Sequence, residues 1–384
     1  MTNTFISARA GQQVQQQAGD SGFSAFIPVR LPPVPPLALD GKLGGLLERA
    51  SLSIGRLDGL SRGFDPHRLF YMYVRKEALL SSEIEGTQST LAELLEFESA
   101  DAPGTPVEDV VEVSRYVRAL YHAVARMIDG FPLSLRLLRE THEVLMADGR
   151  GSNQAPGEFR RTQNWIGGTR PGNARFVPPP PHELMRVLGE LETFVAEDNT
   201  STLVKAGLAH AQFETIHPFL DGNGRIGRML ITMILCEGGA LSQPILYLSL
   251  FFRRQRAEYY DALQRVRTHG DWEGWMKFYL EGVEWTAQQA IRTTLDLLAL
   301  FSSDRDRVMS SARGASLLRV YDVLQQHVIV SIRRVARVLE ISVPTATAAL
   351  MRLQELGIAR ETTGRKYGRL FAYSEQLEIL NRME

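Results

Sequence analysis

The segment from His217 to Arg228 reads HPFLDGNGRIGR and combines the residue types that phosphate chemistry needs. Its Asp-Gly-Asn-Gly stretch favours a tight turn, and a helical pattern begins near Arg225. Free backbone N–H groups at that helix N-terminus would attract phosphate. Asp221 adds a hard oxygen ligand suited to Mg²⁺, and His217 adds a base that works near neutral pH. The segment therefore predicts a site that handles phosphates, a metal ion and a proton.

A helix must lead into this segment, because Ala206, Ala209, Phe213 and Ile216 recur at helical spacing. Pro218 then disfavours helical backbone at the preceding residue, so the helix should end at the histidine. Residues 222–227 match the dinucleotide fingerprint G-x-G-x-x-G, but that fingerprint requires a preceding strand. We interpret the match as accidental. No Walker A sequence occurs in the chain.

The segment resembles the Fic-family motif H-P-F-x-[D/E]-G-N-G-R-x-x-R, with every position filled. The sequence from Pro156 to Arg160 is similar to the family's approach to its target-docking flap, and residues 164–177 are similar to the flap hairpin. Residues 259–263 and 272–275 resemble the helices after the motif. The resemblance covers roughly residues 25–380, as in long bacterial members that join a Fic core to a winged helix.

The resemblance implies transfer of AMP from ATP to a Ser, Thr or Tyr hydroxyl of a protein. His217 would take the proton of the target, and Asp221 would hold Mg²⁺ between the phosphates. Arg228 would hold the γ-phosphate. The other ATP contacts implied are the backbone around Gly222, Asn223, Gly224, Ile226 and Gly227, the supporting Arg225, and Tyr260 beside the adenosine.

The direction and the nucleotide stay open at this point. Gly224 stands where a phosphate-transferring relative has lysine, which favours AMP transfer over phosphate transfer. Transfer of UMP or of another nucleotide is an alternative, because the motif does not select the base. Removal of AMP from a protein by the same site is another.

The segment Ser81–Gly86 resembles the family's inhibitory motif [S/T]-x-x-x-E-[G/N]. Alone it would indicate only a helix that ends at Gly86. The resemblance implies that Ser81, Glu85 and Gly86 form a built-in brake, in which Glu85 pairs with Arg228 and competes with the γ-phosphate. In some members the same glutamate orients a water for AMP removal.

Two short extended segments form the expected flap. Its residues are Asn164, Trp165 and Ile166 on one side, and Arg175, Phe176 and Val177 on the other. An exposed hairpin edge can pair with an extended target segment through the backbone, which tolerates varied target sequences.

The expected fold is mainly α, a Fic-type helical core with a β-hairpin flap and a C-terminal winged-helix domain. We predict a disordered tail at 1–24, an N-terminal helical region with the inhibitory motif at 25–112, the catalytic core at 113–305 and the winged helix at 306–384. The last region shows three helical patterns, with Ser342 capping the third, and two strands around residues 363–368. Residues 313–369 hold ten basic and four acidic residues, a net charge of +6.

That charge makes DNA a possible partner of the winged helix. The alternative to an enzyme is therefore a DNA-binding regulator whose Fic core senses a nucleotide. The expected partners are ATP, a hydroxyl-bearing protein that can be the chain itself, and a second copy in a homodimer.

The composition of the chain excludes several other classes of protein and site. The 384 residues are 44% apolar and 23% charged with a net charge of -1, which is ordinary for a globular chain and argues against a chain-wide nucleic-acid surface. A single cysteine, Cys236, excludes an intrachain disulfide and any cysteine-rich zinc site. No signal peptide and no apolar run of about 18–20 residues is visible, so we expect a cytoplasmic protein without a membrane span.

Overall fold

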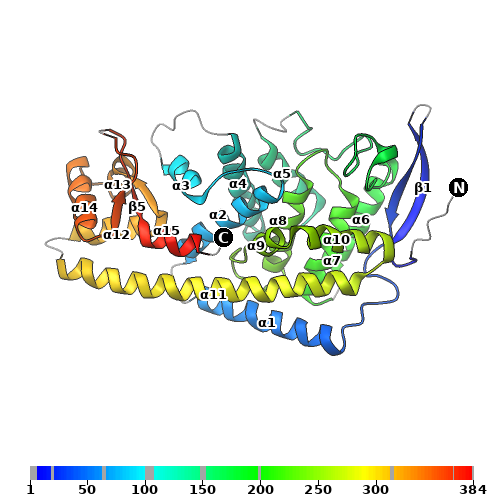
Figure 1. Cartoon of the computed structure of the whole chain (residues 1–384), viewed down its shortest axis with the longest axis horizontal. Coiled ribbons are helices and arrows are strands. Elements are labelled where there is room, and N and C mark those ends of the chain that lie inside the picture. Colours follow the sequence, from blue (N-terminus) through cyan, green and yellow to red (C-terminus); the bar gives the residue numbers. More distant parts are fainter. Residues whose placement is uncertain are drawn as a thin grey trace.

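The computed structural model describes residues 7–18, 21–62, 66–99, 108–147, 153–197, 200–311, 315–365 and 367–382. Within these ranges most residues lie in α-helices, and the strands form two small antiparallel sheets (Figure 1). The prediction of a mainly α fold is confirmed. Figure 1 shows an elongated molecule, with the N-terminal strands at one end and the C-terminal helices at the other.

The motif segment lies between two buried helices, α7 (Thr202–Ile216) and α8 (Asn223–Glu237). From Leu203 to its end α7 is buried on all sides, as expected for a helix in the centre of a domain. The helices around this pair are α4 (Glu108–Ile128), α5 (Leu135–Met146), α6 (Pro181–Glu197), α9 (Ser249–Arg254) and α10 (Arg256–His269). The motif loop therefore connects two helices that are buried in the core.

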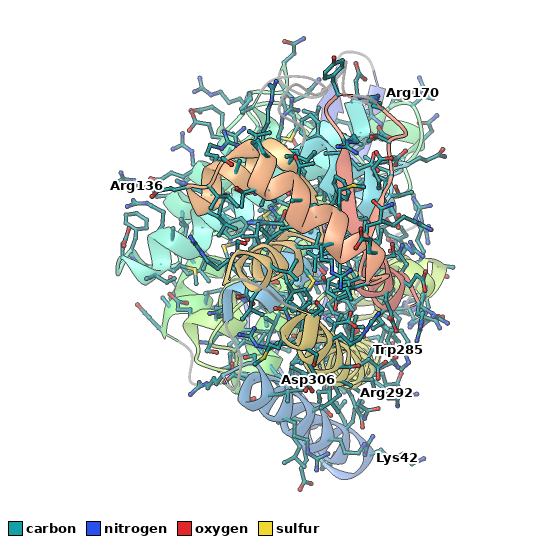
Figure 2. All side chains as sticks on the ribbon, turned by 90° about the vertical axis from the view of Figure 1, so that its left-hand side faces the viewer. Lys42, Arg136, Arg170, Trp285, Arg292 and Asp306 are labelled. Atoms are coloured by element: carbon teal, nitrogen blue, oxygen red, sulfur yellow. The ribbon has the colours of Figure 1, made fainter. Side chains whose placement is uncertain are left out.

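The longest helix, α11 (Trp272–Ser311), runs along the whole molecule, and α1 (Gly41–Arg62) packs beside it. Figure 2 shows this pair from the end of the molecule, with Lys42 labelled on α1 and Arg292 on α11. The predicted boundary between core and C-terminal domain, at 305/306, falls inside α11, and the predicted boundary at 112/113 falls inside α4. Continuous helices thus cross both divisions.

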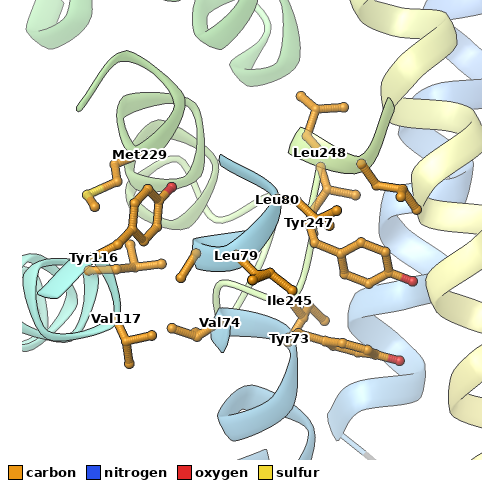
Figure 3. Packing of buried hydrophobic residues seen from close by; sticks show 14 of the residues in the cluster. Tyr73, Val74, Leu79, Leu80, Tyr116, Val117, Met229, Ile245, Tyr247 and Leu248 are labelled. Carbon is orange, nitrogen blue, oxygen red and sulfur yellow. The ribbon is translucent and has the colours of Figure 1, made fainter. Parts of the chain in front are cut away.

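Helix α2 (Pro66–Ile84) carries the inhibitory segment at its C-terminal end, and α3 (Leu91–Ser99) follows it. The apolar residues of α2 are buried between two groups of neighbours (Figure 3). Val74 lies near Val117 of α4, and the ring of Tyr73 is tilted against that of Tyr247, with centroids 5.1 Å apart. Packing on both sides fixes where α2 ends.

Residues 315–382 form the C-terminal unit, with helices α12 (Ala315–His327), α13 (Ile332–Leu339), α14 (Val343–Glu355) and α15 (Ser374–Asn381). Its strands are β3 (Ile329–Ser331), β4 (Ala359–Glu361) and β5 (Leu370–Tyr373), paired antiparallel in the order β3-β5-β4. Ser342 caps α14 as predicted, because its hydroxyl accepts the N–H of Thr345 at 3.2 Å. The prediction of two strands missed β3, whose three residues are too few to show a pattern.

The N-terminal strands β1 (Gly11–Ala18) and β2 (Ser21–Pro28) form an antiparallel hairpin. The prediction of a disordered tail at 1–24 is therefore wrong for residues 11–18 and 21–24. The polar, glutamine-rich β1 carries no apolar alternation, and it is ordered by pairing with β2, whose Phe23, Ala25 and Phe26 are buried. Residues 1–6, 19 and 20 lie outside the described residues.

None of the helices within the described ranges is long and apolar enough to cross a membrane.

Removing the aromatic anchor of the hairpin should loosen it. The ring of Phe26 is 5% exposed and lies 5.6 Å from the ring of Phe176, between centroids. We expect Phe26→Ala to cost about 3 kcal/mol locally, so hairpin amides should exchange roughly 100-fold faster in hydrogen-exchange mass spectrometry. Val34→Ala, at a residue that is 74% exposed, is the control. If the amides of Gly11–Pro28 exchange at the wild-type rate in Phe26→Ala, Phe26 does not anchor the hairpin.

Candidate functional site: the loop between helices α7 and α8

The motif loop turns sharply at His217, which has left-handed backbone with φ 50° and ends α7. Its other end is Gly222, with φ 76°, at the start of α8. Between them the Asn223 side chain closes the loop on itself, because its Oδ1 accepts the Phe219 N–H at 2.8 Å and its Nδ2 donates to the Phe219 carbonyl at 2.9 Å. The N-terminus of α8 is thereby presented to the loop, as the sequence predicts.

The imidazole of His217 is mostly enclosed, with 21% of its side chain exposed. Burial, together with the charges of Arg267 and Arg160, lowers its pKa below the ordinary value. The ring is therefore neutral near pH 7, which is the state that a general base needs. Its Nδ1 has no hydrogen-bond partner among the described residues, and the nearest carboxylate oxygen is Oε2 of Glu214, 4.0 Å away.

Arg160 fixes the backbone behind the histidine. Its Nε donates to the His217 carbonyl at 2.9 Å, its Nη1 to the Thr162 carbonyl at 3.2 Å and its Nη2 to the Pro179 carbonyl at 2.6 Å. Asn164, predicted as part of the docking flap, also directs its amide inward, and its Nδ2 donates to the His217 carbonyl at 3.1 Å. These two residues join the flap segment to the motif loop.

His142 of α5 supports the loop from the other side and was not found by sequence reasoning. Its ring stacks on Phe219 with centroids 3.7 Å apart. Its Nδ1 accepts the Gly157 N–H at 2.9 Å, so its Nε2 carries the hydrogen that is donated to the Asp221 carbonyl at 3.0 Å. Burial lowers its pKa to about 4. Its place on an apolar helix face gave no sequence signal for this contact.

The Asp221 carboxylate is half exposed, and its Oδ1 accepts the Gly222 N–H at 2.6 Å. The described residues contain no group of three or more His, Cys, Asp or Glu side chains that could hold a metal ion. A single exposed carboxylate nevertheless suits Mg²⁺, which takes most of its ligands from water and substrate phosphates. Asp221 fits a substrate-bound ion and does not fit a metal held by the protein alone.

Arg225 points away from the open side of the loop. Its Nη1 donates to Oε1 of Glu112 at 2.5 Å, and its Nη2 lies 3.8 Å from Oδ1 of Asp221. Glu112 of α4 was not found by sequence reasoning, since nothing in its spacing marks it. Arg225 was predicted to support the phosphate chain; the contacts tie it to α4 and to the loop.

The guanidinium of Arg228 is 2% exposed and is held by the segment Ser81–Gly86, which was predicted to be inhibitory. Its Nη2 lies 2.6 Å from Oε1 of Glu85 and donates to the Ser81 carbonyl at 2.9 Å, while its Nε donates to the Ser81 hydroxyl at 2.8 Å. Burial alone would raise the pKa of Glu85, but the charge and hydrogen bond of Arg228 outweigh it and lower that pKa. The predicted ion pair is present.

The carboxylate of Glu85 lies against the start of α8. A Cβ placed on Gly224 would come within 2.1 Å of Oε1 of Glu85 and within 3.0 Å of Nη1 of Arg228. An anionic group therefore already fills the space beside the free N–H groups of the helix. Gly86, with φ 105°, lets the chain turn away directly after Glu85.

Tyr260 of α10 is half-buried at the edge of an aromatic cluster, with its ring centroid 5.1 Å from that of Tyr259. The Tyr259 hydroxyl meets Nε2 of His210 at 2.9 Å, and the opposite ring nitrogen of His210 meets the Gly227 carbonyl at 2.7 Å. Ile226 and Gly227 are buried in α8. This chain of contacts ties Tyr260 to the motif helix.

The flap is shorter than predicted. Ile166 and Phe176 form a single antiparallel bridge, with hydrogen bonds of 2.8 and 3.1 Å. The N-terminal hairpin covers the second side, because the Phe26 N–H donates to the Val177 carbonyl at 2.9 Å. Trp165 is 39% exposed, and Arg175 pairs with Asp261 at 2.8 Å. The side with Trp165 is therefore the more open one.

Two family models match the chain. The model of the Fic/DOC family N-terminal region matches residues 45–125, and that of the Fic/DOC family matches residues 132–235. Residues 132–235 therefore form a Fic domain. The Fic model ends within α8 and so includes the whole motif loop, and the N-terminal model includes the inhibitory segment.

Curated relatives with this domain are named protein adenylyltransferase Fic. Those from Drosophila erecta and Drosophila melanogaster are each 29% identical over 220 residues, which is 56% of this chain and 41% of the relative. The chain thus spans about two fifths of the length of these relatives.

Two solved structures share the Fic fold. A Fic family protein from Desulfovibrio desulfuricans G20 matches with a TM-score of 0.57 at 20% identity, over 88% of this chain and 97% of that one. Fic-1 (residues 134–508) from C. elegans matches with a TM-score of 0.51 at 20% identity, over 66% of this chain and 74% of that one.

Replacing the guanidinium of Arg160 by the ammonium of lysine should destabilise the motif loop. Arg160→Lys cannot donate to three diverging carbonyls at once, so we expect a loss of about 1–3 kcal/mol and a melting temperature lower by a few degrees. Arg161→Lys is the matched control, because that side chain is 88% exposed. Equal melting curves for the two variants would show that Arg160 does not hold the loop.

Proposed function

We propose that this Fic domain transfers AMP from ATP to a Ser, Thr or Tyr hydroxyl of a protein, and that Glu85 inhibits the transfer. The observation that carries the proposal is the meeting of a neutral His217, a helix N-terminus and a buried arginine around one loop. The names of the curated relatives support the same activity. AMP transfer is proposed over phosphate transfer because Gly224 stands where a phosphate-transferring relative has lysine, and the choice of AMP over another nucleotide rests on the names of the relatives.

The proposed step is a displacement at the α-phosphorus of ATP. The target oxygen bonds to that phosphorus while the bond to the bridging oxygen breaks, and pyrophosphate leaves. The target proton passes to Nε2 of His217 and later to solvent. The N–H groups of α8 and the guanidinium of Arg228 would hold the negative charge of the phosphates. Asp221 would hold Mg²⁺, which, when bound, neutralises phosphate oxygens.

The inhibition follows from competition for one arginine. In the folded chain Arg228 has its charge balanced by Glu85 at 2.6 Å, so a γ-phosphate must displace that carboxylate. The Glu85 carboxylate also lies beside Gly224, where it adds repulsion against any phosphate. ATP would therefore bind without reaching the productive position. The contact is within the chain, so no separate inhibitor is needed.

Removing the carboxylate should raise activity, which few substitutions at a site do. We expect Glu85→Gly to increase self-labelling from α-³²P-ATP with Mg²⁺ at least about tenfold, because Arg228 gains a free donor for the γ-phosphate. The gain should disappear when His217→Ala is added, since loss of a general base costs about 10²–10⁴ in rate.

Glu83→Gly is the control, because Glu83 lies in the same turn but pairs with Arg253. Labelling by Glu85→Gly at or below the wild-type level would remove the inhibitory role. Release of AMP by wild type, lost in Glu85→Gly, would instead favour the reverse reaction.

The flap is proposed to hold the target through its backbone, and the open edge at Trp165 is the side left free by the N-terminal hairpin. Ile166→Pro removes the N–H that bonds the Phe176 carbonyl at 2.8 Å. In the Glu85→Gly background we expect transfer to protein to fall about tenfold or more while ATP affinity changes less than twofold. Equal losses in calorimetric ATP binding and in labelling would argue against a docking role.

The C-terminal unit is proposed to be a winged helix, which its helix order and three antiparallel strands support. Helix α14 offers few side chains for base contacts, and one of them, Arg352, is paired with Glu355 at 2.7 Å. That pairing favours a protein-binding or scaffolding role over sequence-specific DNA binding. The homodimer and the cytoplasmic location stay predictions.

A further inference from the structure

A buried carboxyl group lies one helical turn before the catalytic histidine. Glu214 of α7 has a side chain only 8% exposed, and its Oε1 has no hydrogen-bond partner among the described residues. Nδ1 of His217 also lacks a partner there, and Oε2 of Glu214 is the carboxylate oxygen nearest to it, at 4.0 Å. The Glu214 carboxyl group and Nδ1 of His217 therefore lie close together, without a hydrogen bond between them.

The position of Glu214 leaves it few other roles. An ideal Cβ on Gly227 would lie 2.6 Å from its Oε1, so the carboxyl is pressed against α8. Arg267 donates to the Thr215 hydroxyl at 3.3 Å and to the backbone carbonyl of Glu214 at 2.9 Å, and not to the Glu214 carboxyl. A buried carboxyl oxygen without a partner is costly to keep, and a hydrogen on Nδ1 of His217, 4.0 Å from the other carboxyl oxygen, would offer this group a donor.

The charged groups around Glu214 come from several elements. Arg228 of α8 and Arg267 of α10 favour its carboxylate form, while Glu85 after α2 opposes it. Burial is the largest effect and raises the pKa of Glu214 to about 7. Arg160 lies on the far side of His217. Glu214 can therefore change charge in the range where the enzyme would work.

We propose that Glu214 is a positioning residue for His217, which accepts the Nδ1 hydrogen of the imidazole and leaves Nε2 free to take the proton of the target. The consequence for catalysis rests on the proposed AMP transfer. When Nε2 gains the proton, the ring becomes an imidazolium with a hydrogen on each nitrogen. The ionised Glu214 stabilises that charge and does not itself take the proton, which leaves to solvent from Nε2.

The kinetic test uses self-labelling in the Glu85→Gly background between pH 5.5 and 9. With Glu214 present, the rate should rise about tenfold per pH unit and level off below about pH 7, because only the carboxylate form supports the imidazolium and the opposing charge of Glu85 is absent in this background. Glu214→Gln should lower kcat about 10²-fold at pH 8, leave KM for ATP within twofold and abolish that rise. Glu214→Asp keeps the charge and should retain the rise in part.

A second measurement does not depend on transfer. In ¹⁵N-resolved NMR of the full chain, with the His217 signals assigned by their loss in His217→Ala, the wild-type ring should carry its hydrogen on Nδ1. Glu214→Gln should shift this population toward Nε2. Asp304→Asn is the control for a structural carboxylate, since Asp304 accepts the Tyr373 hydroxyl at 2.6 Å far from the site. It should alter thermal stability and leave both readouts unchanged.

The possible outcomes distinguish a failure of the positioning role of Glu214 from a failure of the proposed AMP transfer. An unchanged tautomer and an unchanged pH profile in Glu214→Gln would overturn the positioning role, even if AMP transfer is found. A changed tautomer without any labelling in the Glu85→Gly background would support the positioning role and count against the proposed function. A fall in kcat with an unchanged pH profile, matched by Asp304→Asn, would reduce Glu214 to a structural residue and overturn the proposal.

Discussion

A buried guanidinium needs an anion and acceptors around it, and in this protein that requirement falls on Arg228. Its charge is 2% exposed and is met by the Glu85 carboxylate, the Ser81 hydroxyl and the Ser81 carbonyl. All three acceptors come from the end of α2. The pairing therefore decides both where α2 lies against α8 and which group lies at the N-terminal end of α8.

Helix α2 is in turn held by the C-terminal unit. The buried Lys76 donates to the Leu380 carbonyl, and Nε2 of Gln376 meets Sδ of Met72 at 3.0 Å. The ring of Tyr71 lies 5.2 Å from that of His327. The same helix thus connects the C-terminal unit at one end with Glu85 at the other. Figure 1 shows how α11 spans the same two regions in one continuous rod.

Different side chains hold different parts of the motif loop. Asn223 closes it from within, Arg160 and Asn164 hold its carbonyls from the flap side, and His142 holds it from α5. Each of these polar side chains forms hydrogen bonds with backbone groups of the loop. What remains for chemistry is the ring of His217, the exposed carboxylate of Asp221 and the N–H groups of α8, so the framework and the reactive groups are separate sets.

The sequence by itself determined the local features. Pro218 after His217, the glycines around Asn223 and the cap at Ser342 act within a few residues, so their helix ends could be predicted from short-range sterics and hydrogen bonds. The resemblance to a family, and not spacing, supplied the pairing of Glu85 with Arg228, which lie 143 positions apart.

Only the tertiary structure decided the partners that meet across the fold. Glu112 reaches Arg225 over 113 positions, and His142 reaches Asp221 over 79. Nothing near these residues in the chain marks the contact, because it depends on how α4 and α5 pack against α8. The glutamine-rich β1 pairs with β2, and β2 packs against the flap and against helices α6 and α7. Local pattern sets helix ends, whereas burial between distant helices selects which polar groups must be paired.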